Sequence, residues 1–242
     1  MNPNDISLVL QKHATEFHQV VPFNKDRDKL VALDLSKHND AFNESVYEST
    51  AVFSNYINEK LAAQHATYLI GCYKEHREMY RRSELFDRNL PGFEDQNEEP
   101  RSIHLGTDIW GPVGTKIFAP LGGMVHSFAY NNHHGDYGAT IILQHQLKTN
   151  NFYTLYGHLS LSDIGKLRTG QFISRGEEFA HFGPAEENGN WPAHLHFQLI
   201  LDMSNYEGDY PGVCKLSELA KYTANCPNPD LILQMNQFID PS

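Results

Sequence analysis

The stretch HLHFQLILD, residues 194–202, decides the fold class of this chain. His194, His196 and Gln198 alternate in it with large apolar residues. Successive side chains of a β-strand point to opposite faces, so this pattern predicts a strand whose apolar face packs in a core. The two imidazoles are then presented side by side on the other face.

The residues around this strand predict a sheet. From 101 to 205 the sequence has short β-type runs separated by Gly, Pro and Asn at intervals of about ten residues. We expect strands over residues 116–119, 124–130, 139–145, 152–156, 179–182 and 194–202. This texture predicts an antiparallel, β-rich core, shaped as a barrel-like sandwich.

The two ends of the chain differ from this core. Apolar spacings of three and four residues predict helices over 7–21 and 43–64, and short apolar runs predict strands over 30–35 and 67–73. A polar stretch over 87–101 indicates a linker. The prediction is an α+β protein with a mainly helical extension (1–100), the core (101–205) and a tail that packs on the core (206–242), with a helix near 216–223.

Composition excludes several classes of function. The chain has 242 residues and a formal net charge of -11, without a Lys/Arg cluster, which argues against nucleic acid as a partner. No apolar run is long enough for a membrane span, and the first residues do not resemble an export signal, so we expect no membrane partner and a cytoplasmic location. The cysteines, Cys72, Cys214 and Cys226, are widely spaced and predict free structural thiols.

A second group of candidate residues lies in His104-Leu105-Gly106-Thr107-Asp108. Gly106 disfavours a helix, so we expect the imidazole and the carboxylate to meet across a strand end and a turn. Zinc accepts both ligand types, and catalytic zinc usually has three protein ligands. His104, Asp108 and one of His194 or His196 supply three, while Tyr156-Gly157-His158 ends another predicted strand with one more imidazole.

Together these segments resemble the LytM or lysostaphin-type zinc metallopeptidases, whose pattern is H-x3-D, then G-H, then H-x-H. All three parts occur in order, and the surrounding residues 114–125 and 170–183 are similar to the family's strand-turn-strand and barrel segments. The resemblance covers about residues 101–203 and implies that His104, Asp108 and His196 bind one zinc ion. It implies that His158 and His194 are the catalytic histidines.

The resemblance also implies a function. The chain would be a zinc-dependent metalloendopeptidase that hydrolyses a peptide bond in peptidoglycan-derived peptides or peptides containing glycine or D-alanine. Zinc would activate a water molecule, with His158 and His194 as acid/base and oxyanion partners. The expected partner is a peptide, such as a cell-wall fragment. The helical H-E-x-x-H design is absent from the sequence.

Two other interpretations remain open at this point. The domain would be a non-hydrolytic zinc-binding module in regulation or interaction, or a zinc-free sheet protein whose histidines coincide by chance. A looser similarity of residues 67–80 and 101–108 to the peptidase-like middle part of cytoplasmic multidomain bacterial proteins leaves a wall substrate in doubt. The presence of both His158 and His194 favours an enzyme, because a binding module needs neither acid nor base.

Some residues near the motifs are weaker candidates. Tyr137, Tyr156 and Trp191 are possible substrate walls, and residues 68–101 or the loop 208–212 are possible covers of the cleft. The remaining histidines of the predicted core are expected to serve packing or the surface; they are His126, His133, His134, His145 and His181.

Overall fold

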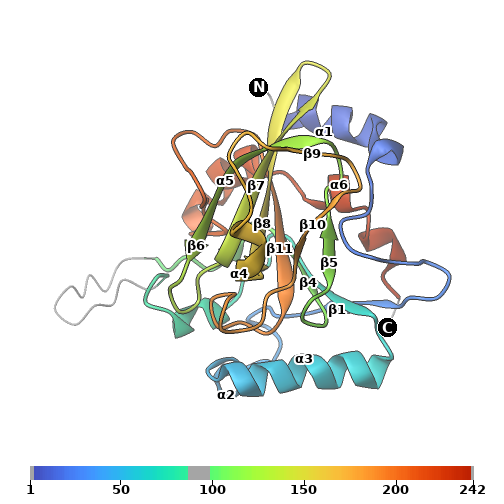
Figure 1. Ribbon diagram of the computed structural model, residues 1–242. Coiled ribbons are helices and arrows are strands. Elements are labelled where there is room, and N and C mark those ends of the chain that lie inside the picture. The colour runs from blue at the N-terminus through green and yellow to red at the C-terminus, as the bar shows by residue number, and fades with distance from the viewer. Residues whose placement is uncertain (1–2, 87–98, 241–242) are drawn as a thin grey trace.

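The computed structural model of the protein describes residues 3–86 and 99–240, and its centre is an eight-stranded sheet (Figure 1). Along the sheet the strands are β1 (Leu30–Leu33), β2 (Tyr68–Gly71), β4 (Thr107–Trp110), β11 (His194–Ile200), β8 (Asn150–Leu159), β7 (Gly138–Leu147), β6 (Gly123–Asn131) and β9 (Phe172–Ile173). Only β1 and β2 pair in parallel within this sheet, and the other neighbours are antiparallel. The predicted α+β class with an antiparallel core is therefore confirmed.

Two small antiparallel sheets complete the strands. One pairs β5 (Lys116–Phe118) with β10 (Glu178–His181), and the other pairs β3 (Ile103–His104) with β12 (Val213–Cys214). The expected strands from 116 to 202 are all present, with ends that shift by a few residues. We expected only a strand end near β3 and β4 and did not expect β9 and β12, because these short segments show no alternation of polar and apolar residues.

Strand β11 has the predicted two faces. All seven of its residues are buried. Leu195, Phe197 and Leu199 belong to the main hydrophobic core, while His194 and His196 lie on the other face. The alternation of residues 194–200 therefore places both imidazoles on one rigid surface.

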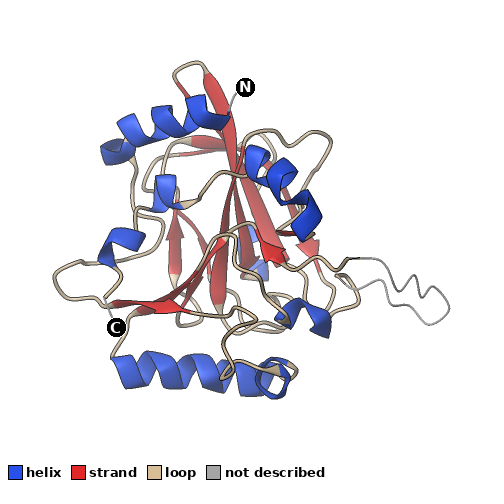
Figure 2. Ribbon diagram, turned by 180° about the vertical axis from the view of Figure 1, so that it is seen from behind, coloured by secondary structure: helices blue, strands red, loops and turns tan. Residues whose placement is uncertain are grey.

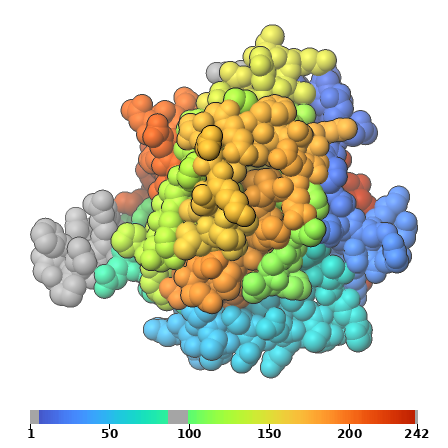
Figure 3. Space-filling view, viewed as in Figure 1, coloured from blue at the N-terminus to red at the C-terminus, as the bar shows by residue number. Residues whose placement is uncertain are grey.

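Residues 43–64 form two helices rather than the single one predicted. Helix α2 (Glu44–Tyr47) and helix α3 (Thr50–Gln64) are separated at Ser49, whose side chain accepts a hydrogen bond from the Val52 amide at the start of α3. Such a cap satisfies an amide that has no partner within the helix. In Figure 3, α2 and α3 (light blue to cyan) cover the lower end of the molecule.

The predicted helix over 7–21 is wrong in its second half. Helix α1 (Pro3–Lys12) is followed by the short 3-10 helix η1 (Ala14–Glu16), and the chain then runs extended. There the amide of Phe118 donates to the carbonyl of Val20, and Val20 and Val21 are buried in the main core. Packing against the sheet, together with this hydrogen bond, replaces the helix. Figure 2 shows α1 and α3 at opposite ends of the sheet.

The C-terminal residues return to the core. They form η3 (Leu216–Glu218), α5 (Leu219–Asn225), α6 (Asp230–Leu233) and η4 (Asn236–Phe238), in agreement with the helix expected near 216–223. Ile232, Leu233 and Met235 belong to the main core, and Ile239 forms a parallel bridge with Leu30 of β1. Both chain ends thus share the central sheet and its core, while the division at residues 100 and 205 stays a prediction.

The remaining short helices are η2 (Met79–Arg82) and α4 (Leu161–Ile164), and the linker predicted at 87–101 lies outside the described residues apart from 99–101. All three cysteines are free, as expected. Among the described residues, no helix has the length and apolar character needed to cross a lipid bilayer.

Candidate metal centre and active site

The H-x3-D segment folds as a strand, a bend and a second strand. His104 ends β3, Asp108 lies in β4, and the chain bends at Gly106 between them without reversing its direction. A Cβ on residue 106 would lie 2.4 Å from Cε1 of the His196 ring. Glycine is therefore required here, because it lets the ring of β11 lie against the bend that carries the other two residues.

Three side-chain atoms meet at this point. Asp108 Oδ1 lies 3.2 Å from His104 Nε2 and 3.1 Å from His196 Nδ1, and the two nitrogens are 2.9 Å apart. Ligand atoms around a tetrahedral zinc ion lie roughly 3.3 Å apart, given the usual bond lengths. In the described part of the chain, these residues form the one His/Cys/Asp/Glu group with metal-binding spacing.

The opposite side of each imidazole is already occupied by an acceptor. His104 Nδ1 lies 3.2 Å from the carbonyl of Cys72, which accepts only, so this nitrogen carries the proton. His196 Nε2 lies 2.9 Å from Gln198 Oε1. The side-chain nitrogen of Gln198 donates to the Pro211 carbonyl. Two lone pairs and a carboxylate oxygen thus converge without a proton between them. This arrangement fits a cation and makes these residues suitable ligands.

Electrostatics favour the same protonation states. Burial, reinforced by the Arg77 charge, lowers the pKa of His104 to about 4. Burial would raise the pKa of Asp108, but His104 and Arg77 outweigh it and hold this pKa well below its usual range. At neutral pH the site therefore presents a neutral imidazole and a carboxylate, the forms that ligate metal.

His158 and His194 lie together beside this group. Their rings stack with centroids 4.1 Å apart, and the other face of His194 stacks on Trp110 at 3.9 Å. Each Nδ1 donates to a backbone carbonyl at 2.7 Å, that of Asn188 for His158 and that of Pro192 for His194. Each Nε2 therefore carries a lone pair.

Burial also sets the charge of these two histidines. It lowers the pKa of His194 to about 4 and that of His158 well below its ordinary value. Both rings are neutral at pH 7 and can accept a proton. His158 has a left-handed backbone (φ 64°), a costly conformation for a non-glycine residue that the surrounding structure must hold in place.

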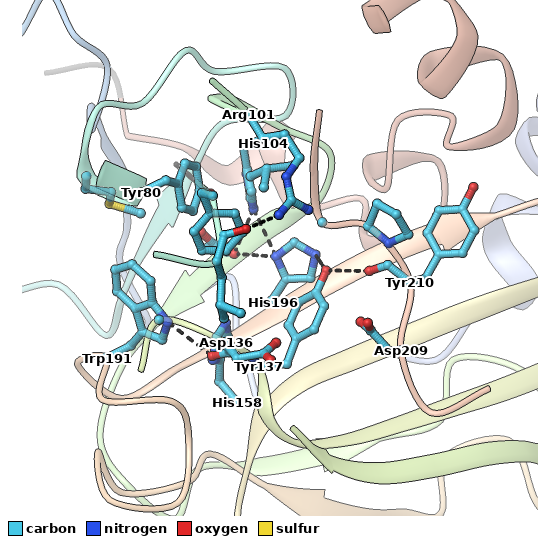
Figure 4. A pocket seen from close by; sticks show the side chains of 18 of the residues that line it. Tyr80, Arg101, His104, Asp136, Tyr137, His158, Trp191, His196, Asp209 and Tyr210 are labelled. Atoms are coloured by element: carbon cyan, nitrogen blue, oxygen red, sulfur yellow. Dashed lines mark hydrogen bonds and ion pairs between the residues drawn. The ribbon is translucent and has the colours of Figure 1, made fainter. Parts of the chain in front are cut away.

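All five predicted residues line one cavity of about 300 Å³ (Figure 4). Around His196, the cavity has Tyr137 next to the ring, Asp209 and Tyr210 on one side, and Trp191 on the opposite side. Tyr137 donates to the Tyr210 carbonyl at 3.2 Å, and its oxygen lies 3.4 Å from His196 Nε2.

The structure separates the weaker candidates. Tyr137 and Trp191 line the cavity as suggested, but Tyr156 does not; it is fully buried, and its ring packs against Phe179 and Phe197. The substrate-wall role for Tyr156 is therefore wrong, because its side chain points to the core face of β8. The loop 208–212 and the described residues 79–86 contribute to the cavity wall, and their role as covers of the cleft stays a prediction. Their cavity-lining members are Met79, Tyr80, Leu85, Phe86, Asp209, Tyr210, Pro211 and Gly212.

Sequence reasoning did not single out several charged residues at the site. Arg77 and Glu75 contact it from outside the motif region. Arg101 and Asp209 line the cavity, and they lie in the two segments that were suggested only as covers. An isolated charged residue about thirty positions from a motif has no local periodicity that would reveal its partner. The pairing of β2 with β4, continued by the hydrogen bonds of residues 74–77 to residues 102–104, brings Arg77 to Asp108.

Comparison with known proteins agrees with the motif. Residues 102–207, somewhat under half of the chain, match Peptidase family M23. This part of the chain is therefore similar to the M23, LytM-like peptidases, and the expected resemblance is confirmed. The match contains all five predicted site residues.

One similar characterised protein is the peptidoglycan DD-endopeptidase ShyC of Vibrio cholerae. It is 29% identical over 99 residues, which are 41% of this chain and 20% of ShyC. The chain thus spans about a fifth of the length of this relative.

Solved structures with partial similarity include two peptidases. A zinc-containing peptidase from Vibrio cholerae is 26% identical, with a TM-score of 0.33 over 40% of this chain and 27% of that one. The catalytic domain of lysostaphin from Staphylococcus simulans is 15% identical, with a TM-score of 0.38 over 69% of this chain and 97% of that one.

Proposed function

We propose that this chain is a zinc-dependent metalloendopeptidase, with His104, Asp108 and His196 as the metal ligands and His158 and His194 as the catalytic histidines. The observation that carries the proposal is the convergence of two imidazole lone pairs and a carboxylate oxygen within 3.2 Å of one another. Two further neutral imidazoles lie beside them in the same cavity. A packing cluster has no need of five such groups at one point.

The chemistry follows from the donor set. Zinc bound there would supply a Lewis acid that polarises a carbonyl group and activates water. His158 and His194, with Nδ1 fixed by backbone carbonyls, offer Nε2 as a proton acceptor at neutral pH and as a donor once protonated. Between them they would take a proton from water, stabilise the oxyanion and protonate the leaving amine.

We propose a peptide from peptidoglycan, or one containing glycine or D-alanine, as the substrate. The M23 match and the similarity to a peptidoglycan DD-endopeptidase support this class. The cavity agrees with it, since about 300 Å³ admits a few small residues. The rings of Tyr80, Tyr137 and Trp191 provide flat walls for an extended backbone with small side chains.

The test combines metal analysis with hydrolysis of tetraglycine and of D-Ala-containing stem peptides. We expect one zinc per chain, cleavage of at least one peptide by the wild type, and a roughly 10²- to 10⁴-fold loss of rate in His194→Ala with zinc retained. His133→Ala is the matched control, because His133 is exposed and does not line the cavity. A fully zinc-loaded wild type that cleaves neither peptide would support the non-hydrolytic module instead.

A further inference from the structure

Residues 72–77, which follow β2, contact two of the three proposed ligands although they lie outside the M23 match. The carbonyl of Cys72 accepts from His104 Nδ1 at 3.2 Å. The backbone of His104 is held as well, since its amide donates to the Glu75 carbonyl and its carbonyl accepts from the Lys74 amide, both at 2.9 Å. The extension therefore holds His104 by ring and by backbone.

Arg77 holds the second ligand. Its guanidinium is fully buried, and Nη1 donates to Asp108 Oδ2, the oxygen that does not face the two histidines. Nε donates to Glu75 Oε2 at 2.7 Å, and the other oxygen of Glu75 accepts from the Leu35 amide at 3.1 Å. Arg77 is thus fixed between two carboxylates and tied to the end of β1.

Gly71 makes room for this contact. It lies opposite Asp108 in the β2 to β4 pairing, and a Cβ at this position would come within 2.7 Å of Arg77 Nη2. Nη2 itself is buried and has no hydrogen-bond partner among the residues that the structure describes. The guanidinium thus occupies the space that a side chain at position 71 would fill. Any side chain there would push the guanidinium away from the Asp108 carboxylate.

We infer that Arg77 is a positioning residue of the metal centre, which engages Asp108 Oδ2 and leaves Oδ1 as the single oxygen available to the ion. The inference rests on the proposed zinc site. A carboxylate without this partner can rotate or offer both oxygens, so the orientation that matches the two imidazoles is lost. Partners in this outer position typically change metal affinity by about 10- to 100-fold.

A purely structural ion pair is the competing explanation. Arg77 links the extension to the core, and breaking a buried pair destabilises a protein whatever its function. The two explanations differ in what they predict for a folded variant. A structural pair changes the unfolding midpoint alone, whereas a positioning residue also changes the affinity for zinc and the ligand field of the bound metal.

The experiment measures zinc dissociation constants by chelator competition for the wild type, Arg77→Met, Arg77→Lys and Gly71→Ala. Arg82→Met is the matched control, an arginine of the neighbouring η2 that bonds Thr50 and touches none of the proposed ligands. Circular dichroism establishes which variants fold. Visible absorption of the Co²⁺ forms reports on the number of metal ligands independently of peptide cleavage.

We expect Arg77→Met to bind zinc about 10- to 100-fold more weakly, with an altered Co²⁺ spectrum. The zinc affinity of Arg77→Lys should lie between those of Arg77→Met and the wild type, since lysine keeps the positive charge but lacks the planar, forked donor group of arginine. Gly71→Ala should weaken binding with Arg77 still present, so it carries the test if Arg77→Met does not fold.

Two results would overturn the inference. One is that Gly71→Ala and Arg77→Lys have the zinc affinity and the Co²⁺ spectrum of the wild type, or that they bind zinc more tightly than the wild type. The other is an equal loss in Arg82→Met. Failure of the wild type to bind zinc would instead remove the proposed function itself, and the inference with it.

Discussion

The buried histidines of this protein are of two kinds, which differ in how their ring nitrogens are hydrogen-bonded. His145 on β7 has both ring nitrogens satisfied, Nδ1 by the Gly122 carbonyl at 3.1 Å and Nε2 by Thr154 Oγ1 at 2.7 Å. His104 and His196 each have one nitrogen satisfied in this way, while the other points at electron-rich atoms of the cavity. A free lone pair, rather than burial, distinguishes a candidate ligand from a packing residue.

The pKa values do not make this distinction. Burial lowers the pKa of His145 to about 4, as it does for His104 and His194. Desolvation disfavours the charged imidazole wherever it is buried. The comparison shows that a shifted pKa locates a functional histidine only when its hydrogen bonds leave a nitrogen free.

The largest expected effect is the loss of a proposed ligand. Asp108→Ala should abolish stoichiometric zinc binding and lower peptide hydrolysis by at least about 1,000-fold, because the ion loses its one anionic donor. Chelation of zinc from the wild type should lower the rate to the same level, and added zinc should restore it only in the wild type. Metal analysis and a peptide-cleavage assay check this, and cleavage that survives complete zinc removal would contradict it.

His158→Ala should separate catalysis from metal binding. We expect a rate loss of roughly 10²- to 10⁴-fold with zinc content unchanged, since His158 contributes a proton acceptor rather than a ligand. Cleavage rates and zinc content measured on one sample provide the check. Loss of zinc from folded His158→Ala would place this residue among the metal ligands instead.

Replacing His145, whose two ring nitrogens are both hydrogen-bonded, should change the stability of the protein rather than its activity. The pKa of His145 is about 4 in the folded protein and about 6.5 when unfolded, so the unfolded chain binds more protons between these values. Its contribution is fully present above pH 6.5 and is lost as pH falls toward 4. Over this pH range, the contribution of His145 to the free energy of unfolding changes by about 3 kcal/mol.

Denaturant unfolding of the zinc-free protein from pH 7 to pH 4 measures this effect. His145→Ala should lose less stability over the range than the wild type, while its zinc content and cleavage rate at pH 7 stay within about twofold of wild type. Equal pH slopes in the two proteins would show that His145 does not titrate as its burial requires.

The smallest expected effect comes from removing the hydrogen bond that holds His196 Nε2, the ring nitrogen that faces away from the proposed metal. Gln198→Leu removes the acceptor for His196 Nε2 and should weaken zinc binding by about tenfold, because the ring loses its fixed tautomer. Chelator competition measures this change, and Gln198→Glu, which keeps an acceptor, is the control. If Gln198→Leu binds zinc as tightly as the wild type, the hydrogen bond does not orient the ring.

The sequence by itself determined the parts of this protein that depend on local periodicity and local spacing. The alternation of residues 194–202 gave the central strand and its two faces, and the order of the H-x3-D, G-H and H-x-H segments pointed to the M23 family. Strand periodicity is a property of neighbouring residues, so it can be seen before the chain is folded.

Only the tertiary structure decided which distant residues meet. The apolar residues of 7–21 fit a helix, yet Val20 and Val21 pack in the main core from an extended segment. Tyr156 fitted a cavity wall but faces the core. Arg77 carried no signal, and the pairing of residues 69–77 with residues 102–110 brings it to Asp108. Contacts between residues far apart in the chain depend on strand order and register, which no local pattern specifies.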